Sequence, residues 1–147
     1  MDLSRVKWVA LAALVVLLGW LFTEPGISYL HRKFTSDPGG DPKQAELNEL
    51  GLSRLGGFLL RTLRYEWAER VFEDALRLYP DGKNSRYVLY RLAKVKEKRG
   101  DYRAAVAILE RLMYENAHAI DDRVPNNDVL NLRRNKLVET HELGTVR

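Results

Sequence analysis

Hydrophobic residues along this chain of 147 residues follow two contrasting patterns. From Trp8 to Phe22 the run WVALAALVVLLGWLF has no polar group beyond two indoles, and no residue between Lys7 and Glu24 is charged. From Leu47 onward, apolar residues recur every three or four positions, the spacing of one helix face. No stretch alternates apolar and polar residues over the length of a β-strand. The pattern predicts an all-α protein, with a single N-terminal transmembrane helix followed by a short domain of antiparallel helices.

The N-terminal run is short for a membrane span. At about 1.5 Å per residue it covers roughly 23 Å of a ~30 Å hydrocarbon core, so Lys7 must snorkel, while Trp8 and Trp20 suit the two interfaces. The alternative is a cleaved signal peptide with Arg5 in its basic start, but residues 21–24 lack a small-residue cleavage site. We therefore expect a retained anchor with its N-terminus inside and the domain outside.

A cluster of proline, glycine and aspartate separates the anchor from the helices. The stretch TSDPGGDPK has no apolar residue to bury, so it predicts a linker. Asp41 and Pro42 suit the start of a helix, and Gln44 completes the spacing of a capping box. Further breaks are expected at Pro80–Ser85, Gly100 and Asp121–Asn127. The predicted units are residues 1–34 (anchor and juxtamembrane segment), 35–43 (linker) and 44–147 (helical domain).

Internal repetition is the most informative feature of the helical part. The first copy contains Leu52, Leu55, Gly56, Tyr65, Ala68, Phe72, Ala75 and Pro80; the second, 37 positions later, contains Leu89, Tyr90, Leu92, Ala93, the turn Gly100-Asp101-Tyr102, Ala105, Leu109 and Leu112. This spacing resembles the tetratricopeptide repeat (TPR) family. The extra residues between copies resemble the bacterial envelope subgroup that includes the β-barrel assembly lipoprotein and the Tol-associated coordinator. The resemblance implies repeats at about 49–82 and 86–119, with a capping helix at about 127–143.

Composition and residue spacing argue against catalysis. The 24 Lys and Arg against 20 Asp and Glu are too balanced for a dedicated nucleic-acid binder, and the absence of cysteine removes thiolate chemistry. His31, His118 and His141 have no metal-ligand spacing, and the glycine pairs lack the setting of a phosphate loop. We expect no enzyme activity, no cofactor, no metal and no small-molecule substrate.

The resemblance implies a concave groove lined by the first helix of each repeat. Carrying those positions over selects Arg61, Tyr87, Tyr90, Arg91, Lys94 and Lys98. A basic and aromatic groove fits acidic peptide segments of other proteins, and the alternative is an ordinary solvated helix face. We therefore expect a single-pass scaffold or adaptor in a bacterial inner membrane, with its domain on the periplasmic side. A permanent accessory subunit of a membrane complex and a basic helix that contacts anionic lipid are the other hypotheses.

Overall fold

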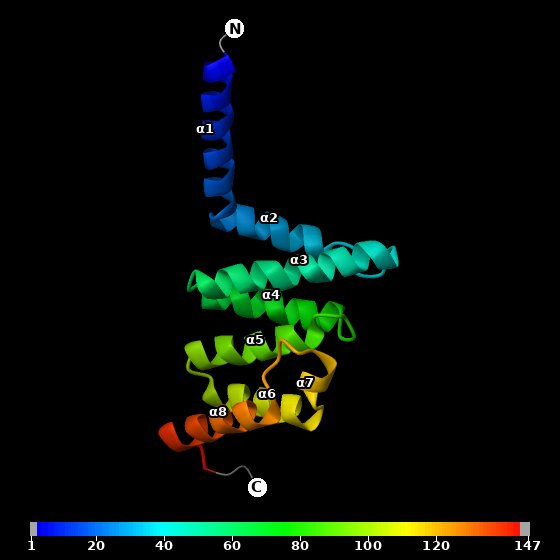
Figure 1. Cartoon of the computed structure of the whole chain (residues 1–147), viewed down its shortest axis with the longest axis vertical. Helices are drawn as coiled ribbons and strands as arrows, with labels where there is room; N and C mark the ends of the chain where they lie inside the picture. The colour runs from blue at the N-terminus through cyan, green and yellow to red at the C-terminus, as the bar shows by residue number, and fades with distance from the viewer. Residues whose placement is uncertain (1–2, 145–147) are drawn as a thin grey trace.

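The structure, a computed structural model, describes residues 3–144, which contain eight α-helices and no strand. The helices are α1 (Leu3–Leu21), α2 (Glu24–Thr35), α3 (Pro42–Arg61), α4 (Tyr65–Leu78), α5 (Ser85–Lys98), α6 (Tyr102–Tyr114), α7 (Ala117–Ile120) and α8 (Asn127–Thr140). Helices α2 to α6 and α8 are stacked one beside the next, and α1 projects from one end (Figure 1). The all-α prediction is confirmed. The outermost residues of the predicted units, 1–2 and 145–147, lie outside the described residues.

Helix α1 stands away from the rest of the molecule (Figure 1), and many of its apolar side chains are exposed. Trp8 and Val16 are 71% and 72% exposed. The helix ends at Leu21, and the chain then bends into α2. No single helix in residues 3–144 combines the length and hydropathy of a membrane span; α1 and α2 reach both only as a pair, across a 77° bend. The structure therefore does not support the predicted single transmembrane helix, because the apolar run ends where the chain bends.

Helix α2 lies across α3 and contributes to the core. Ile27 is fully buried. The ring of Phe34 covers Gly51, where an added Cβ would lie 2.5 Å from Cε1 of the ring. His31 Nε2 lies 2.8 Å from Asp74 Oδ2 on α4. The sequence predicts this segment as part of the anchor, with a linker after it; in the structure that linker is the loop between two packed helices.

Helix α3 begins where the sequence predicts, but without a capping box. Pro42 occupies the first turn, and the side chain of Asp41 accepts a long hydrogen bond of 3.5 Å from the backbone N–H of Lys43. Gln44 does not reach back to the cap, because its Nε2 donates to Asn48 Oδ1 at 2.9 Å. The start of α3 therefore depends on the fixed φ of proline more than on side-chain capping.

Helices α3 and α4, and then α5 and α6, form two antiparallel pairs at the positions of the two predicted repeats. Ala68 and Ala105 are fully buried, as predicted. Gly56 on α3 faces Phe72 on α4, and an added Cβ there would lie 2.3 Å from Cε1 of the ring. Small residues therefore let the helix axes approach closely within each pair.

Left-handed backbone conformation forms the tight turns between paired helices. Gly100, with φ +81°, follows α5, and Asp101 then caps α6 by accepting a 3.2 Å hydrogen bond from the N–H of Ala104. The turn between α3 and α4 instead places Leu63 at φ +62°. The three predicted breaks are confirmed at residues 79–84, 99–101 and 121–126, whereas the turn at 62–64 carries no glycine or proline.

The stack ends on α8, which covers α6. Leu130 and Leu137 are buried in the core cluster that α5, α6 and α8 share. On the outer side of α8, Val129 and Leu132 are 49% and 72% exposed. Val129 therefore does not belong to the buried stripe of Leu130 and Leu137, and α8 packs on α6 through a narrow face.

Candidate partner-binding face

Arg91 joins α3 and α5 along the face where the sequence predicts a groove. Its Nη1 donates a hydrogen bond of 3.1 Å to the carbonyl oxygen of Ser53, one helix pair earlier. The guanidinium lies against Gly57, where an added Cβ would come within 2.5 Å of Nη1. The missing side chain at Gly57 thus provides the space that Arg91 occupies. Because the direction of the chain alternates between neighbouring helices, α3 and α5 run the same way (Figure 1).

Tyr87 lies between two guanidinium groups. Arg91 and Arg123 place their Cζ atoms 4.5 and 4.8 Å from the centre of its ring. Arg123 is fixed by Asp121, with Nη2 2.7 Å from Oδ2, and by a 3.0 Å bond to Asn84 Oδ1. The hydrogen bonds from Arg123 lower the pKa of Asp121 despite its burial. This cluster makes Tyr87 a rigid, half-buried part of the surface.

Tyr90 belongs to the core more than to the groove. Its side chain is 8% exposed and packs in the cluster between α5, α6 and α8. Lys94 lies above its ring, with Nζ 4.6 Å from the centroid. Lys98, one turn further on, and Arg61, at the end of α3, are exposed. Of the six predicted groove residues, Tyr90 is therefore a support for Lys94 and the other five reach the surface.

Many basic residues of the stack are neutralised by acidic neighbours. On α4, Arg70 lies 2.6 Å from Glu66 and Arg77 lies 2.5 Å from Asp74. Other pairs of this kind, at 2.6–3.0 Å, are Lys83–Glu46, Arg86–Glu115, Arg111–Glu115, Arg133–Glu97 and Arg134–Glu110. These pairs compensate the charges of the basic residues that form them.

Lys96 and Arg99, on the side of α5 that faces α4, are compensated as well. Lys96 Nζ lies 2.5 Å from Glu69 and 2.8 Å from Glu73, and Arg99 also binds Glu69. Burial alone would raise the pKa of Glu69, but the hydrogen bonds and charges of Lys96 and Arg99 lower it overall. Arg86, Lys96 and Arg99 each have a carboxylate partner, so they add little net positive charge to the surface of α5.

A second group of cations lacks such partners, and five of its members lie along α3 and α5. Within the described residues, no carboxylate oxygen is within ion-pair distance of Arg54, Arg61, Arg91, Lys94 or Lys98. Residues 54 and 61 are two helical turns apart, as are 91 and 98, so each helix presents its cations on one side. This arrangement leaves a basic strip beside the aromatic ring of Tyr87.

Sequence reasoning missed Arg54, although a signal for it exists. Arg54 lies 37 positions before Arg91, which is the offset between the two repeats, and it is exposed. Sequence reasoning also missed Arg123, whose position depends on the loop before α8, which folds back to Tyr87. No spacing rule connects those two residues.

The strip is suited to charge recognition. Unpaired ammonium and guanidinium groups bind carboxylates through charge-assisted hydrogen bonds. In residues 3–144, no three His, Asp or Glu side chains come together as metal ligands would. Comparisons with protein-family models, with characterised proteins and with solved structures find no match to this chain.

Proposed function

We propose that this protein is a membrane-anchored adaptor of the tetratricopeptide type, whose α3 and α5 face binds acidic segments of other proteins. The two helix pairs would be the two repeats. The small buried residues Gly56, Ala68 and Ala105 support this assignment, because TPR-like pairs need close helix approach.

The grouping of five unpaired cations along α3 and α5 is the observation that carries the binding proposal. Salt bridges compensate the cations of α4 and the α4-facing side of α5, yet the strip formed by Arg54, Arg61, Arg91, Lys94 and Lys98 has no carboxylate partner in the described residues. Like charges this close together repel one another, and an acidic ligand would relieve that repulsion. Tyr87 adds a rigid aromatic surface for the rest of a bound segment.

Mutation of exposed lysines tests the binding proposal. Lys94→Glu with Lys98→Glu reverses two charges of the strip, while Arg70→Glu with Arg103→Glu makes the same charge change on α4 and α6. Each change should alter stability by less than about 0.5 kcal/mol. We expect the first variant to lose binding of a fluorescent glutamate-rich peptide and of proteins from solubilised membranes, and the second to keep both.

Salt separates a specific site from general attraction. The difference between the strip variant and the unmodified chain should shrink at high ionic strength, because screening acts on exposed charges beyond about 8 Å at physiological salt. Equal losses in both variants would show general charge attraction. Unchanged binding in both would identify the strip as a solvated face and refute the adaptor proposal.

The uncovered apolar surface of α1 supports the anchor. Side chains such as Trp8, Val9 and Val16 are 70–72% exposed, and a continuous apolar surface of this kind is unfavourable in water. We expect the full chain to stay with membranes after alkaline carbonate extraction. Recovery of the intact chain in the soluble fraction would refute the anchor.

The proposed location is a bacterial inner membrane, with the helical stack on the periplasmic side. Protease added to spheroplasts should then digest the stack. Protection of the stack under these conditions would place it in the cytoplasm instead.

A permanent accessory subunit is the second candidate, favoured by the outer side of α8. Val129 and Leu132 are exposed there beside a hollow of about 490 Å³ that Glu97, Arg133 and Lys136 also line. A lasting interface would cover such side chains. A partner protein that co-purifies in a fixed ratio would favour the subunit over the adaptor if Leu132→Glu abolishes the co-purification. The double variant Lys94→Glu with Lys98→Glu should then leave it unchanged.

A further inference from the structure

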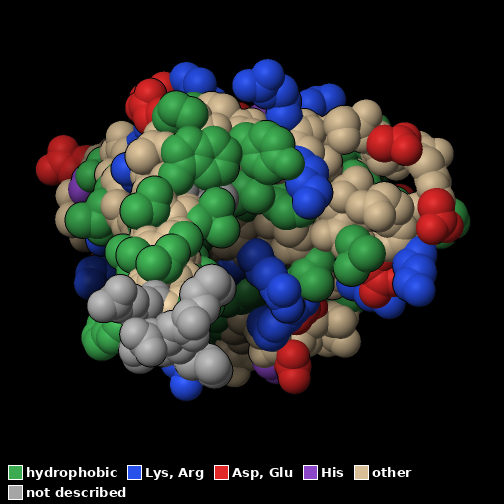
Figure 2. Space-filling view, turned by 90° about the horizontal axis from the view of Figure 1, so that it is seen from above, with side chains coloured by type: hydrophobic (Ala, Val, Ile, Leu, Met, Phe, Trp, Pro, Cys, Tyr) green, Lys and Arg blue, Asp and Glu red, His purple; other side chains and the backbone are tan. Residues whose placement is uncertain are grey.

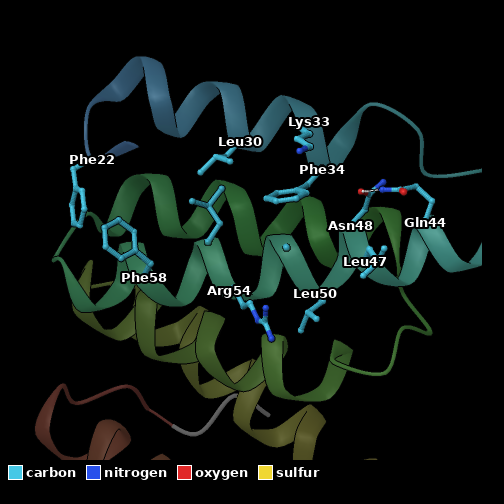
Figure 3. A pocket seen from close by; sticks show the side chains of 12 residues that line it. Phe22, Leu30, Lys33, Phe34, Gln44, Leu47, Asn48, Leu50, Arg54 and Phe58 are labelled. Carbon is cyan, nitrogen blue, oxygen red and sulfur yellow. Dashed lines mark hydrogen bonds between the residues drawn. The ribbon is translucent and has the colours of Figure 1, made fainter. Parts of the chain in front are cut away.

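A groove of about 640 Å³ lies between α2 and α3, beside the base of α1 (Figure 3). Its walls are mostly aromatic and aliphatic, and its volume is in the range of small-molecule sites. The apolar side chains that line it are Phe22, Leu30, Phe34, Leu47, Leu50 and Phe58. They come from the turn after α1, from α2 and from α3, so the groove exists only because α2 packs on α3.

Two aromatic contacts lie along the groove on α3, one at the end near α1 and one near its middle. Phe22, just after α1, packs edge to face on Phe58 with ring centroids 4.8 Å apart. Phe34, near the end of α2, covers Gly51. Between these contacts α2 does not cover α3 completely, and the close-up shows Leu30 and the α3 side chains facing the space (Figure 3). Leu47 at the far end is 53% exposed. The groove is thus an elongated apolar hollow that begins where the chain leaves α1.

The charged side chains that line the groove are all cationic. They are Lys33 on α2 and Arg54 on α3, and neither has a carboxylate within ion-pair distance among the described residues. Viewed from the end that carries α1, the molecule shows a broad hydrophobic area with Lys and Arg at its margins (Figure 2). Apolar walls with unpaired cations fit a ligand that has a hydrocarbon part and an anionic part.

We propose that this groove binds an anionic phospholipid of the membrane that α1 enters, with an acyl chain between α2 and α3 and the phosphate at Lys33 and Arg54. The proposal rests on the membrane anchor of the proposed function. A lipid beside α1 meets the groove at Phe22, so its acyl chain can enter without crossing a polar surface. Juxtamembrane cations attract anionic headgroups in the same way.

A lipid fits the groove better than a peptide does. A peptide in an apolar groove must find partners for its backbone N–H and C=O groups. The polar amides at the far end, Gln44 and Asn48, bond to each other at 2.9 Å. An acyl chain has no hydrogen-bonding groups, so the apolar walls can bury it without leaving a polar group unpaired.

Native mass spectrometry of the full chain released from nanodiscs tests the proposal. The nanodiscs contain phosphatidylcholine and phosphatidylglycerol in equal amounts. We expect the unmodified chain to retain phosphatidylglycerol selectively. Lys33→Gln with Arg54→Gln should reduce that retention by roughly tenfold, the factor expected for loss of charge-assisted contacts. Lys43→Gln with Arg103→Gln removes the same charge elsewhere and should leave retention unchanged.

A second variant tests the acyl site. Leu50→Trp adds bulk to the groove wall and should reduce retention of lipid while far-UV circular dichroism stays unchanged. Retention that is equal for the two lipids, or insensitive to both Leu50→Trp and the charge variant, would overturn the lipid site and leave the anchor intact. Failure of the chain to enter nanodiscs would overturn the anchor itself, and the lipid proposal with it.

Photo-crosslinking identifies a different occupant. A benzophenone side chain at Leu47, which is exposed at the end of the groove, should attach to lipid in membranes. Crosslinks to protein alone would overturn the proposal in favour of a peptide ligand.

Discussion

Adjacent glycines on α3 should respond in opposite ways to the same substitution. Gly56→Ala places a Cβ 2.3 Å from Cε1 of Phe72, whose side chain is fully buried and has no room to withdraw. Overpacking of this kind costs about 1–3 kcal/mol, and the better helix propensity of alanine returns up to about 1 kcal/mol. We therefore expect Gly56→Ala to lower the free energy of unfolding by about 0.5–2 kcal/mol.

Gly57→Ala meets a movable group instead. Its Cβ would lie 2.5 Å from Nη1 of Arg91, the far end of a flexible side chain at the surface. The guanidinium can swing aside and give up its bond to Ser53, which costs about as much as the helix propensity gains. The expected change is therefore between zero and about 1 kcal/mol of stabilisation.

Urea unfolding of the full chain in a mild nonionic detergent, followed by far-UV circular dichroism, measures both changes. The detergent covers α1 in every sample, so differences between variants report on the helical stack. Gly56→Ala with unchanged or increased stability would show that α3 and α4 are further apart than described. Equal destabilisation by both variants would show that Arg91 cannot move, and that Gly57 is a packing position rather than part of an open face.

The remaining predictions concern two buried alanines of the core, a buried carboxylate and the effect of low pH. Ala68→Leu and Ala105→Leu should each destabilise by about 1–3 kcal/mol in the same assay, because both sites are fully buried, and unchanged midpoints would mean that the repeats are misaligned. Glu49→Ala should lower the free energy of unfolding by about 1–3 kcal/mol, because Glu49 is 3% exposed and its Oε1 accepts a 2.7 Å hydrogen bond from the N–H of Asn84, just before α5. Glu49→Gln keeps an acceptor and should cost less. Low pH should weaken the contact between Asp74 on α4 and His31 on α2. Burial raises the pKa of Asp74, but hydrogen bonds and charges from Arg77 and His31 lower it overall. Because the pKa of Asp74 is lower in the folded chain than in the unfolded chain, its ionised carboxylate stabilises the fold above the unfolded pKa, and this stabilisation is lost as the pH falls below about 4. In Asp74→Asn, the free energy of unfolding should therefore change less with pH in this range.

Local residue signals located the helices but not every turn. Pro80 and Gly100 mark breaks that any reader of the sequence would expect, and both are present. The turn between α3 and α4 depends on Leu63 in a left-handed conformation, which is unusual for leucine. No residue there signals a break, so the helix pair could be expected only from the repeat pattern as a whole.

The charge pattern of the candidate face could be predicted only in part. Lys96 and its partners Glu69 and Glu73 are 27 and 23 positions apart, so the compensation appears only when α4 and α5 are packed together. Counting charges along α5 therefore overstates its positive charge. Lys94 is half-buried and Lys98 is exposed, and helical spacing determines that they share one side of α5.

The docking of α2 changes how the anchor and the stack are connected. A flexible linker between them would let the basic strip take any direction relative to a membrane. In the structure the proline- and glycine-rich loop follows α2, and α2 is fixed to the stack by Ile27, by Phe34 on Gly51 and by the pair of His31 with Asp74. Only the short turn after Leu21 separates α1 from α2. The proposed anchor, the groove and the basic strip are therefore coupled through one packed helix, and a variant that releases α2 should affect the proposed lipid retention and partner binding together.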